Sequence, residues 1–179
     1  MSDSARRTLD PPATVAVIGL GNMGRPMAAR LVGAGYSVLG FDAAPEMRGR
    51  FAAETGGTAA ASLEEAVRSA DAVVTMLPDG KVVRAVVDRM RPHLQPGTAI
   101  VEMSSSEPIG TRTLGEELIG QGFAFVDAPV SGGVKRAVDG TLAIMVGGDD
   151  RTIDRVEPLL EAMGRSIFRT GALGSGHAV

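Results

Sequence analysis

The residues of this 179-residue chain with the clearest chemical potential form a glycine-rich run near the amino terminus. The run reads GLGNMG and directly follows a short apolar stretch, residues 15–18. In such a run the first glycine permits a tight turn, the second lets a pyrophosphate approach the backbone, and the third lets helix and strand pack closely. Free amides at the start of the helix then meet the phosphate charge. A glycine-rich turn without function has the same spacing, but strand, turn, helix and second strand fall in order here. We therefore predict that dinucleotide binding involves Gly19, Leu20, Gly21, Asn22, Met23 and Gly24.

An acidic residue follows this run at the distance that ribose recognition requires. Asp42 ends the second apolar stretch and lies 23 positions after Gly19. A carboxylate there accepts a hydrogen bond from the 2′-hydroxyl of NAD and repels the 2′-phosphate of NADP. We expect NAD to be preferred, with NADP possible because Arg48 and Arg50 could reach a phosphate. The alternative is that Asp42 only caps the helix that begins near Pro45.

Two further polar segments follow apolar runs. The first contains Ser104, Ser105 and Ser106, and the spacing of Ser104 and Glu107 suits a capping box, so helix capping is the role we expect for Ser106. The second is a serine followed by two glycines, where a hydroxyl and amides unshielded by side chains would make a small anion nest. The alternative for the second segment is a tight turn that needs two glycines.

The elements that position these residues alternate along the chain. Short apolar runs typical of strands covered on both faces occur at residues 15–18, 38–41, 72–77, 99–103, 123–126 and 142–146. Segments of helical period separate them, including Val82, Val83, Val86 and Val87, where the period outweighs the strand preference of valine. The alternation predicts an α/β fold, a doubly wound, mostly parallel Rossmann-type sheet with helices on both faces.

Three segments fit this pattern less well. Residues 56–61 predict either a short third strand or a loop. Pro158 lies inside a helical pattern, so that helix must start late or bend, and we predict a bend. Residues 1–13 are polar and end in two prolines, which predicts a disordered N-terminal arm before a dinucleotide-binding domain over residues 14–179.

Composition excludes several classes of function. The chain has no cysteine, which excludes thiol catalysis and thiolate metal sites, and we expect no metal. Its net charge of −3, its single tyrosine and its lack of tryptophan argue against nucleic-acid binding. With no run of about 18 apolar residues, we expect no membrane segment and a cytoplasmic protein.

The motifs together resemble the β-hydroxyacid dehydrogenase family, which includes 3-hydroxyisobutyrate dehydrogenase and is related to 6-phosphogluconate dehydrogenase. The resemblance rests on GLGNMGRPM at 19–27, MLP at 76–78, DAPVSGG at 127–133, DGTLAIMVGG at 139–148 and GSGHAV at 174–179. It implies hydride transfer between a nicotinamide cofactor and a small 3-hydroxy acid or its semialdehyde. It further implies that Leu77 and Pro78 line the cofactor groove, that Ser105 approaches the nicotinamide, and that the substrate carboxylate is held by Ser131, Gly132 and Gly133.

The carboxyl end departs from the family pattern. Family members carry a catalytic lysine in a GxGxxxK motif, and residues 174–179 match that motif up to the position before the lysine, so the lysine would follow Val179. By the same comparison, we expect the family's all-helical C-terminal domain to be absent from this chain. The resemblance therefore implies no catalytic residue in this chain and negligible turnover by the chain alone. We expect His177 to lie on a frayed terminus and not to replace the lysine. We expect an exposed apolar face and homo-oligomers. The alternative function is a noncatalytic NAD(P)-binding module or degenerate fragment.

Overall fold

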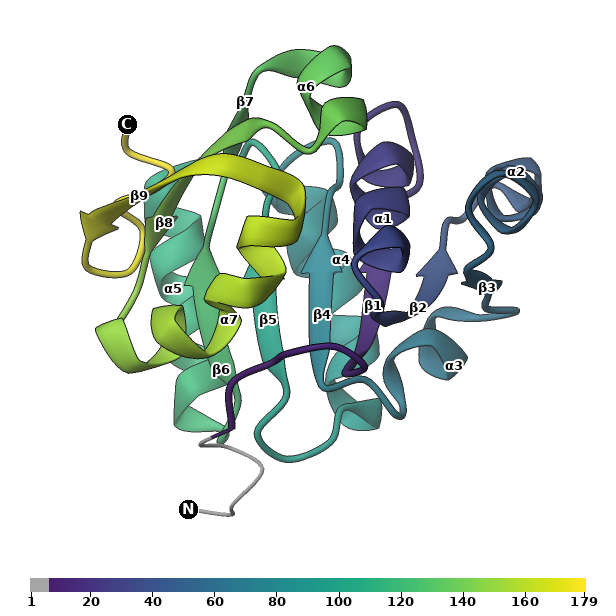
Figure 1. Cartoon of the computed structure of the whole chain (residues 1–179). Helices are drawn as coiled ribbons and strands as arrows, with labels where there is room; N and C mark the ends of the chain where they lie inside the picture. The colour runs from purple at the N-terminus through teal and green to yellow at the C-terminus, as the bar shows by residue number, and fades with distance from the viewer. Residues whose placement is uncertain (1–6) are drawn as a thin grey trace.

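A computed structural model describes residues 7–179, in which nine strands form one sheet with helices on both faces (Figure 1). The strands are β1 Thr14–Ile18, β2 Ser37–Phe41, β3 Thr58–Ala59, β4 Ala72–Thr75, β5 Ala99–Glu102, β6 Ala124–Asp127, β7 Val130–Ser131, β8 Leu142–Gly147 and β9 Gly164–Gly171. The helices are α1 Gly24–Gly33, α2 Pro45–Thr55, α3 Leu63–Val67, α4 Gly80–Met90, α5 Pro108–Gly120, α6 Gly133–Asp139 and α7 Asp150–Met163.

The strand order confirms the predicted doubly wound sheet. It runs β3-β2-β1-β4-β5-β6-β8-β7, and β9 pairs with β8. The strands from β3 to β6 are parallel to their neighbours, whereas β8 is antiparallel to β6 and β7 and parallel to β9. The chain winds outward from β1 to β3 and then crosses back to β4, so a crevice opens at the carboxyl ends of β1 and β4.

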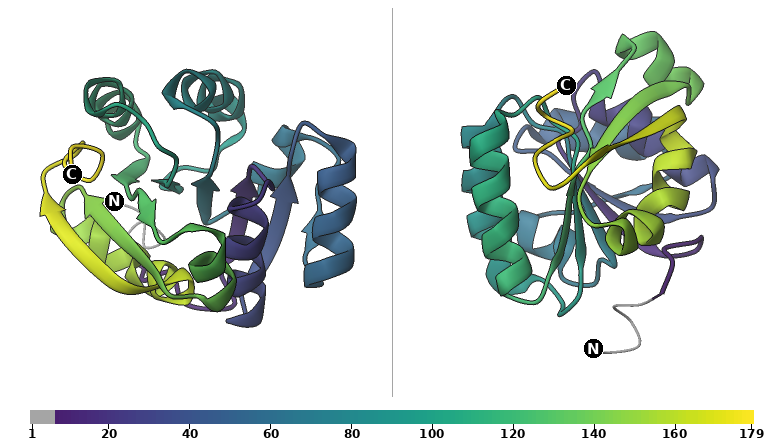
Figure 2. Two further views of the ribbon diagram at one scale, coloured as in Figure 1. Left: turned by 90° about the horizontal axis from the view of Figure 1, so that it is seen from above. Right: turned by 90° about the vertical axis from the view of Figure 1, so that its left-hand side faces the viewer.

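The sheet separates two apolar layers, which explains the continuous apolar runs in the sequence. Along β1, Val15 and Val17 pack with α1, α2, α6 and α7 on one face, whereas Ala16 and Ile18 pack with α3, α4 and α5 on the other. Figure 2 shows α4 and α5 on the opposite side of the sheet from α1 and α7. Because both faces of β1 are buried, every position of the strand core must be apolar.

The ambiguous segments resolve as follows. Residues 58–59 form the short strand β3, and helix α7 runs without interruption through Pro158. The bend at Pro158 stays a prediction. Strands β7 and β9 were not predicted, because β7 has only two residues and β9, with the sequence GRSIFRTG, is largely polar and only partly buried.

The N-terminal segment differs from expectation. Residues 1–6 of the predicted arm lie outside the described residues, but residues 7–13 pack against the domain. Leu9 is buried, its amide donates to the Arg155 carbonyl at 2.9 Å, and its carbonyl accepts from the Tyr36 hydroxyl at 2.8 Å. The prediction of disorder was therefore wrong for residues 7–13, because one leucine in a polar stretch supplies the anchor. Within the described chain, no helix is both long and apolar enough to cross a membrane.

Candidate functional site

The glycine-rich loop connects β1 to α1, and its glycines serve different purposes. Gly19 has φ of +100°, and a Cβ there would lie 2.1 Å from the Met76 carbonyl oxygen. A Cβ on Gly24 would lie 1.9 Å from the Gly19 carbonyl oxygen. A Cβ on Gly21 would meet nothing within 4 Å. Packing therefore requires Gly19 and Gly24, whereas the surface beside Gly21 is open to a ligand.

A groove of about 530 Å³ lies over this loop, at the carboxyl ends of β1, β2 and β4. Eight residues predicted to bind the cofactor line it, namely Gly19, Gly21, Asn22, Met23, Gly24, Asp42, Leu77 and Pro78. Sequence reasoning missed other parts of the wall, including Phe41, Leu63, Val82, Val86 and Arg89. The two valines were visible only as part of a helical period, which assigns a face but not a ligand.

Asp42 connects the glycine-rich loop to the next loop. One carboxylate oxygen accepts from the Leu20 amide at 2.8 Å, and the other accepts from the Ala44 amide at 2.9 Å. A carboxylate has about four lone-pair sites, so acceptor capacity remains for a ligand hydroxyl. Leu20 itself does not line the groove, because its side chain is fully buried and its amide is taken by Asp42.

The two arginines expected near Asp42 already have partners. Arg48 donates to the Asp42 carbonyl at 2.9 Å and lies over the Phe41 ring, 5.4 Å from its centroid. Arg50 pairs with Glu54 at 3.3 Å. A 2′-phosphate would therefore have to draw Arg48 or Arg50 away from these contacts.

The serine loop after β5 does not cap α5 as predicted. Glu107 is the N-cap, and its side chain accepts from the Gly110 amide at 2.6 Å. Ser104 is buried, and its hydroxyl accepts from the Leu77 amide at 2.8 Å. The Ser106 hydroxyl donates to Glu102 at 2.9 Å. The expected capping role of Ser106 was wrong, because the buried carboxylate of Glu102 binds this hydroxyl instead.

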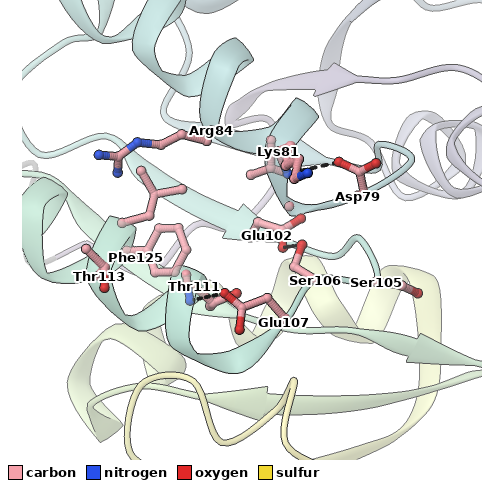
Figure 3. A pocket seen from close by; sticks show the side chains of 14 residues that line it. Asp79, Lys81, Arg84, Glu102, Ser105, Ser106, Glu107, Thr111, Thr113 and Phe125 are labelled. Carbon is pink, nitrogen blue, oxygen red and sulfur yellow. Dashed lines mark hydrogen bonds between the residues drawn. The ribbon is translucent and has the colours of Figure 1, made fainter.

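A second cavity, of about 800 Å³, lies between the amino-terminal halves of α4 and α5. Ser105 is exposed and lines this cavity rather than the groove. Figure 3 shows Ser106 directed toward Glu102, while the Ser105 side chain points away from both. Consecutive residues line the groove and the second cavity. Leu77 and Pro78 line the groove, and Asp79 lines the second cavity.

The predicted substrate loop lies between β7 and α6. Ser131, Gly132 and Gly133 are all exposed, and the glycines have φ of +131° and +70°. A Cβ on Gly133 would meet nothing within 4 Å, so the space beside this residue is open. The loop therefore presents one hydroxyl and open main-chain groups, as an anion nest requires.

The C-terminal segment is not frayed. The His177 side chain is only 1% exposed and lies between Glu102 and Asp127. The expectation of a frayed terminus was wrong, because the Gly174 and His177 amides donate to Asp127 at 2.8 and 3.0 Å.

The position after which the family's lysine is expected lies at the surface. Val179 is 81% exposed and lines neither the groove nor the second cavity. Its amide donates to the Gly176 carbonyl at 3.4 Å, so the turn that holds His177 includes Val179 as well. The two lysines of the chain lie elsewhere, Lys81 on the wall of the second cavity and Lys135 exposed on α6. Neither lysine adjoins Val179 in sequence, and the absence of a catalytic residue from this chain stays a prediction.

Known proteins are similar to this chain in sequence and in fold. A "Probable 3-hydroxyisobutyrate dehydrogenase" of Mycobacterium bovis is 46% identical over 165 residues, which cover 92% of this chain and 56% of that protein. An NAD-dependent L-serine dehydrogenase of Pseudomonas aeruginosa is 43% identical, over 90% of this chain and 55% of that protein. The solved structure of Mycobacterium tuberculosis 3-hydroxyisobutyrate dehydrogenase with L-serine is similar with a TM-score of 0.90 and 45% identity, over 93% of this chain and 57% of that one.

The chain thus spans little more than half the length of these relatives. Their names confirm the resemblance to the β-hydroxyacid dehydrogenases. Residues 14–171 match the family described as the NAD binding domain of 6-phosphogluconate dehydrogenase. The match includes the glycine-rich loop, Asp42 and the groove between them. The chain therefore belongs to the family of the NAD-binding domain of 6-phosphogluconate dehydrogenase.

Proposed function

We propose that this chain is the cofactor-binding part of an NAD-dependent dehydrogenase that acts on a small 3-hydroxy acid or its semialdehyde. The observation that carries the proposal is the groove itself, where eight of the ten residues predicted to bind the cofactor line one surface. The relatives named as 3-hydroxyisobutyrate and L-serine dehydrogenases support the substrate class.

The cofactor fits the groove with its adenosine end at Asp42 and its pyrophosphate over Gly21. Asp42 has acceptor capacity left for the 2′-hydroxyl of NAD, and its charge opposes the 2′-phosphate of NADP. Leu63, Val82 and Val86 form an apolar wall suited to the flat face of adenine. When bound, NAD supplies the hydride acceptor, and the protein supplies binding and orientation.

The substrate carboxylate fits the Ser131–Gly133 loop. Ser131 and Gly133 are both exposed, with open space beside Gly133, and a hydroxyl together with main-chain amides can bind an anion without a cation. We infer that the chain does not turn over by itself, because neither Lys81 nor Lys135 occupies the motif in which the family carries its lysine. Fusing the remaining part of the M. tuberculosis relative to Val179 should restore oxidation of 3-hydroxy acids.

Calorimetry on the wild-type chain and on Asp42→Ala tests the cofactor assignment. We expect NADH to bind the wild-type chain more tightly than NADPH. We expect Asp42→Ala to weaken NADH binding by about tenfold, the effect of losing one hydrogen bond to a charged group. Glu46→Ala, on the exposed start of α2, serves as the matched control and should change neither affinity. Absence of heat with both cofactors in a folded wild-type chain would overturn the proposal.

A further inference from the structure

Three titratable side chains to which the proposed function assigns no role meet in the interior. Glu102 ends β5, Asp127 ends β6, and His177 belongs to the C-terminal segment, and none of the three side chains is more than 1% exposed. The His177 Nε2 lies 3.3 Å from a Glu102 oxygen, and its Nδ1 lies 3.8 Å from an Asp127 oxygen. We refer to these three residues as the buried cluster. Within residues 7–179, no group of His, Cys, Asp or Glu side chains is arranged to hold a metal ion.

The buried cluster holds both sides of Ser105. On one side, the Ser104 amide donates to Glu102 at 2.8 Å, and the Ser104 carbonyl lies 2.7 Å from His177 Nε2. A carbonyl only accepts, so Nε2 carries the hydrogen. On the other side, the Ser106 hydroxyl donates to Glu102 at 2.9 Å. These hydrogen bonds fix the backbone on both sides of Ser105. Ser105 itself is exposed, so its side chain stays available to a ligand.

The same cluster holds the start of the substrate loop. Asp127 is the last residue of β6, four positions before Ser131, and it accepts from the Gly174 and His177 amides at 2.8 and 3.0 Å. The C-terminal segment fits tightly here, because a Cβ on Gly176 would lie 2.6 Å from the Met145 carbonyl oxygen. His177 therefore contacts the strand ends at which two loops begin, the loop that carries Ser105 and the loop that carries Ser131.

Stability alone does not account for a histidine and two carboxylates in this place. Apolar side chains of similar volume usually stabilise an interior at least as well as a buried ionic group does. What apolar groups cannot provide is a directional bond to the Ser104 carbonyl together with a contact to Asp127. The Thr111 hydroxyl, 3.0 Å from His177 Nδ1, fixes the ring from the side of α5.

We propose that His177 is a positioning residue that sets the nicotinamide-side loop at Ser105 relative to the substrate loop at Ser131. The inference rests on the proposed function and on the family resemblance, which implies that Ser105 approaches the nicotinamide end of the cofactor. His177 touches neither cofactor nor substrate. It acts through its bond to the Ser104 carbonyl and through its contacts with Glu102 and Asp127, so its effect falls on the nicotinamide half of NAD and not on the adenosine half.

Two ligands separate these halves. ADP-ribose contains the adenosine, the pyrophosphate and a ribose but lacks the nicotinamide. Its binding therefore depends only on the glycine-rich loop and Asp42. Calorimetric titrations of NADH and ADP-ribose are compared for the wild-type chain, His177→Leu and His177→Gln, with His93→Leu as control for the other histidine, which lies in the turn after α4. Glutamine retains a donor for the Ser104 carbonyl, and leucine has a similar bulk without one.

We expect His177→Leu to weaken NADH binding by about tenfold and ADP-ribose binding by less than about twofold. The substitution releases the loop that carries Ser105 but leaves the glycine-rich loop intact. His177→Gln should recover NADH affinity to within about threefold of the wild-type value. If His177→Leu does not fold, Thr111→Val, which removes the hydroxyl beside Nδ1, should give the same selective loss to a smaller degree.

Equal weakening of both ligands, or no change in either, would overturn the positioning role and leave the proposed function standing. Failure of the glutamine variant to recover NADH affinity would also overturn it, since the bond to Ser104 would then not be the cause. A wild-type chain that binds neither ligand would refute the proposed function, and the positioning role with it. The wild-type titration therefore distinguishes the two failures.

Discussion

Substituting alanine at Gly21 or at Gly24 should separate binding from folding within one loop. A Cβ on Gly21 would meet nothing within 4 Å, and its φ is not left-handed, so alanine fits the free chain. Gly21→Ala should leave stability unchanged or raise it by about 0.5 kcal/mol, because alanine reduces the freedom of the unfolded chain. In the proposed binding mode, the added methyl group would occupy the place where the pyrophosphate approaches the backbone. We expect NADH affinity to fall by about a hundredfold, the loss of one to two charge-assisted hydrogen bonds.

Gly24→Ala should do the reverse, damaging the fold first. Its Cβ would lie 1.9 Å from the Gly19 carbonyl oxygen, and that atom belongs to backbone that Met76 already confines. We expect a loss of about 1–3 kcal/mol in the free energy of unfolding, typical of overpacking. For a domain of this size that lowers the midpoint of thermal unfolding by roughly 2–10 °C. NADH affinity should fall too, because α1 can no longer pack against the loop.

Thermal unfolding monitored by circular dichroism gives the first quantity, and calorimetric titration with NADH gives the second. Gly33→Ala, at the end of α1 where a Cβ meets nothing within 4 Å, is the matched control and should leave NADH affinity unchanged. Wild-type NADH affinity in Gly21→Ala would refute the first expectation, since the groove would then not hold the pyrophosphate. Wild-type stability of Gly24→Ala would refute the second.

Three further predictions address other parts of the chain. Burial, with Asp10 and Glu161 nearby, raises the pKa of Tyr36 to about 12, so the unfolded chain loses this proton first and stability falls between pH 10 and 12, by up to about 2 kcal/mol. Urea unfolding at both ends of this range should show that Tyr36→Phe lacks this part of the fall, and an identical fall in both proteins would contradict it. Ser131→Ala should raise the KM for a 3-hydroxy acid about tenfold in the extended enzyme, with NAD affinity unchanged, as steady-state kinetics can test. Sedimentation should show concentration-dependent self-association, because large apolar side chains such as Ile109 and Phe168 are exposed by 72% and 55%, and a clean monomer at high concentration would count against it.

The parallel part of the fold was predictable because a strand that is buried on both faces has a continuous run of apolar residues. Strand β4 reads AVVT and is fully buried, so periodicity and composition agree on it. Strand β9 has no such run. It covers only the edge of β8, its sequence contains two arginines, and Arg169 pairs with Asp154 and Glu157 on α7. Edge strands of this kind need no apolar pattern, so only pairing in space reveals them.

The groove beside the glycine-rich loop was predictable for a different reason, since a glycine-rich turn and an acid at a fixed distance encode local geometry. What the spacing did not reveal is that Asp42 also binds the Leu20 amide, a contact made when β1 and β2 lie side by side. Capping was predicted wrongly at Ser106 because the competing acceptor, Glu102, looked like an ordinary strand residue. Its carboxylate acts as an acceptor for the serine loop only because the sheet buries it.

The order of the C-terminal segment, residues 174–179, could not be predicted from the sequence. His177 lies 73 positions from Ser104 and 50 from Asp127 along the chain, and no local pattern connects such distant residues. A short segment with two glycines reads as frayed in sequence, since it has neither period nor apolar bulk. Yet a segment that donates two amides to a buried carboxylate and one ring nitrogen to a buried carbonyl cannot leave without exposing unpaired polar groups. Its order is therefore determined by the ends of β5 and β6, and the same bonds that retain it also hold the loops of Ser105 and Ser131, which the proposed positioning role connects.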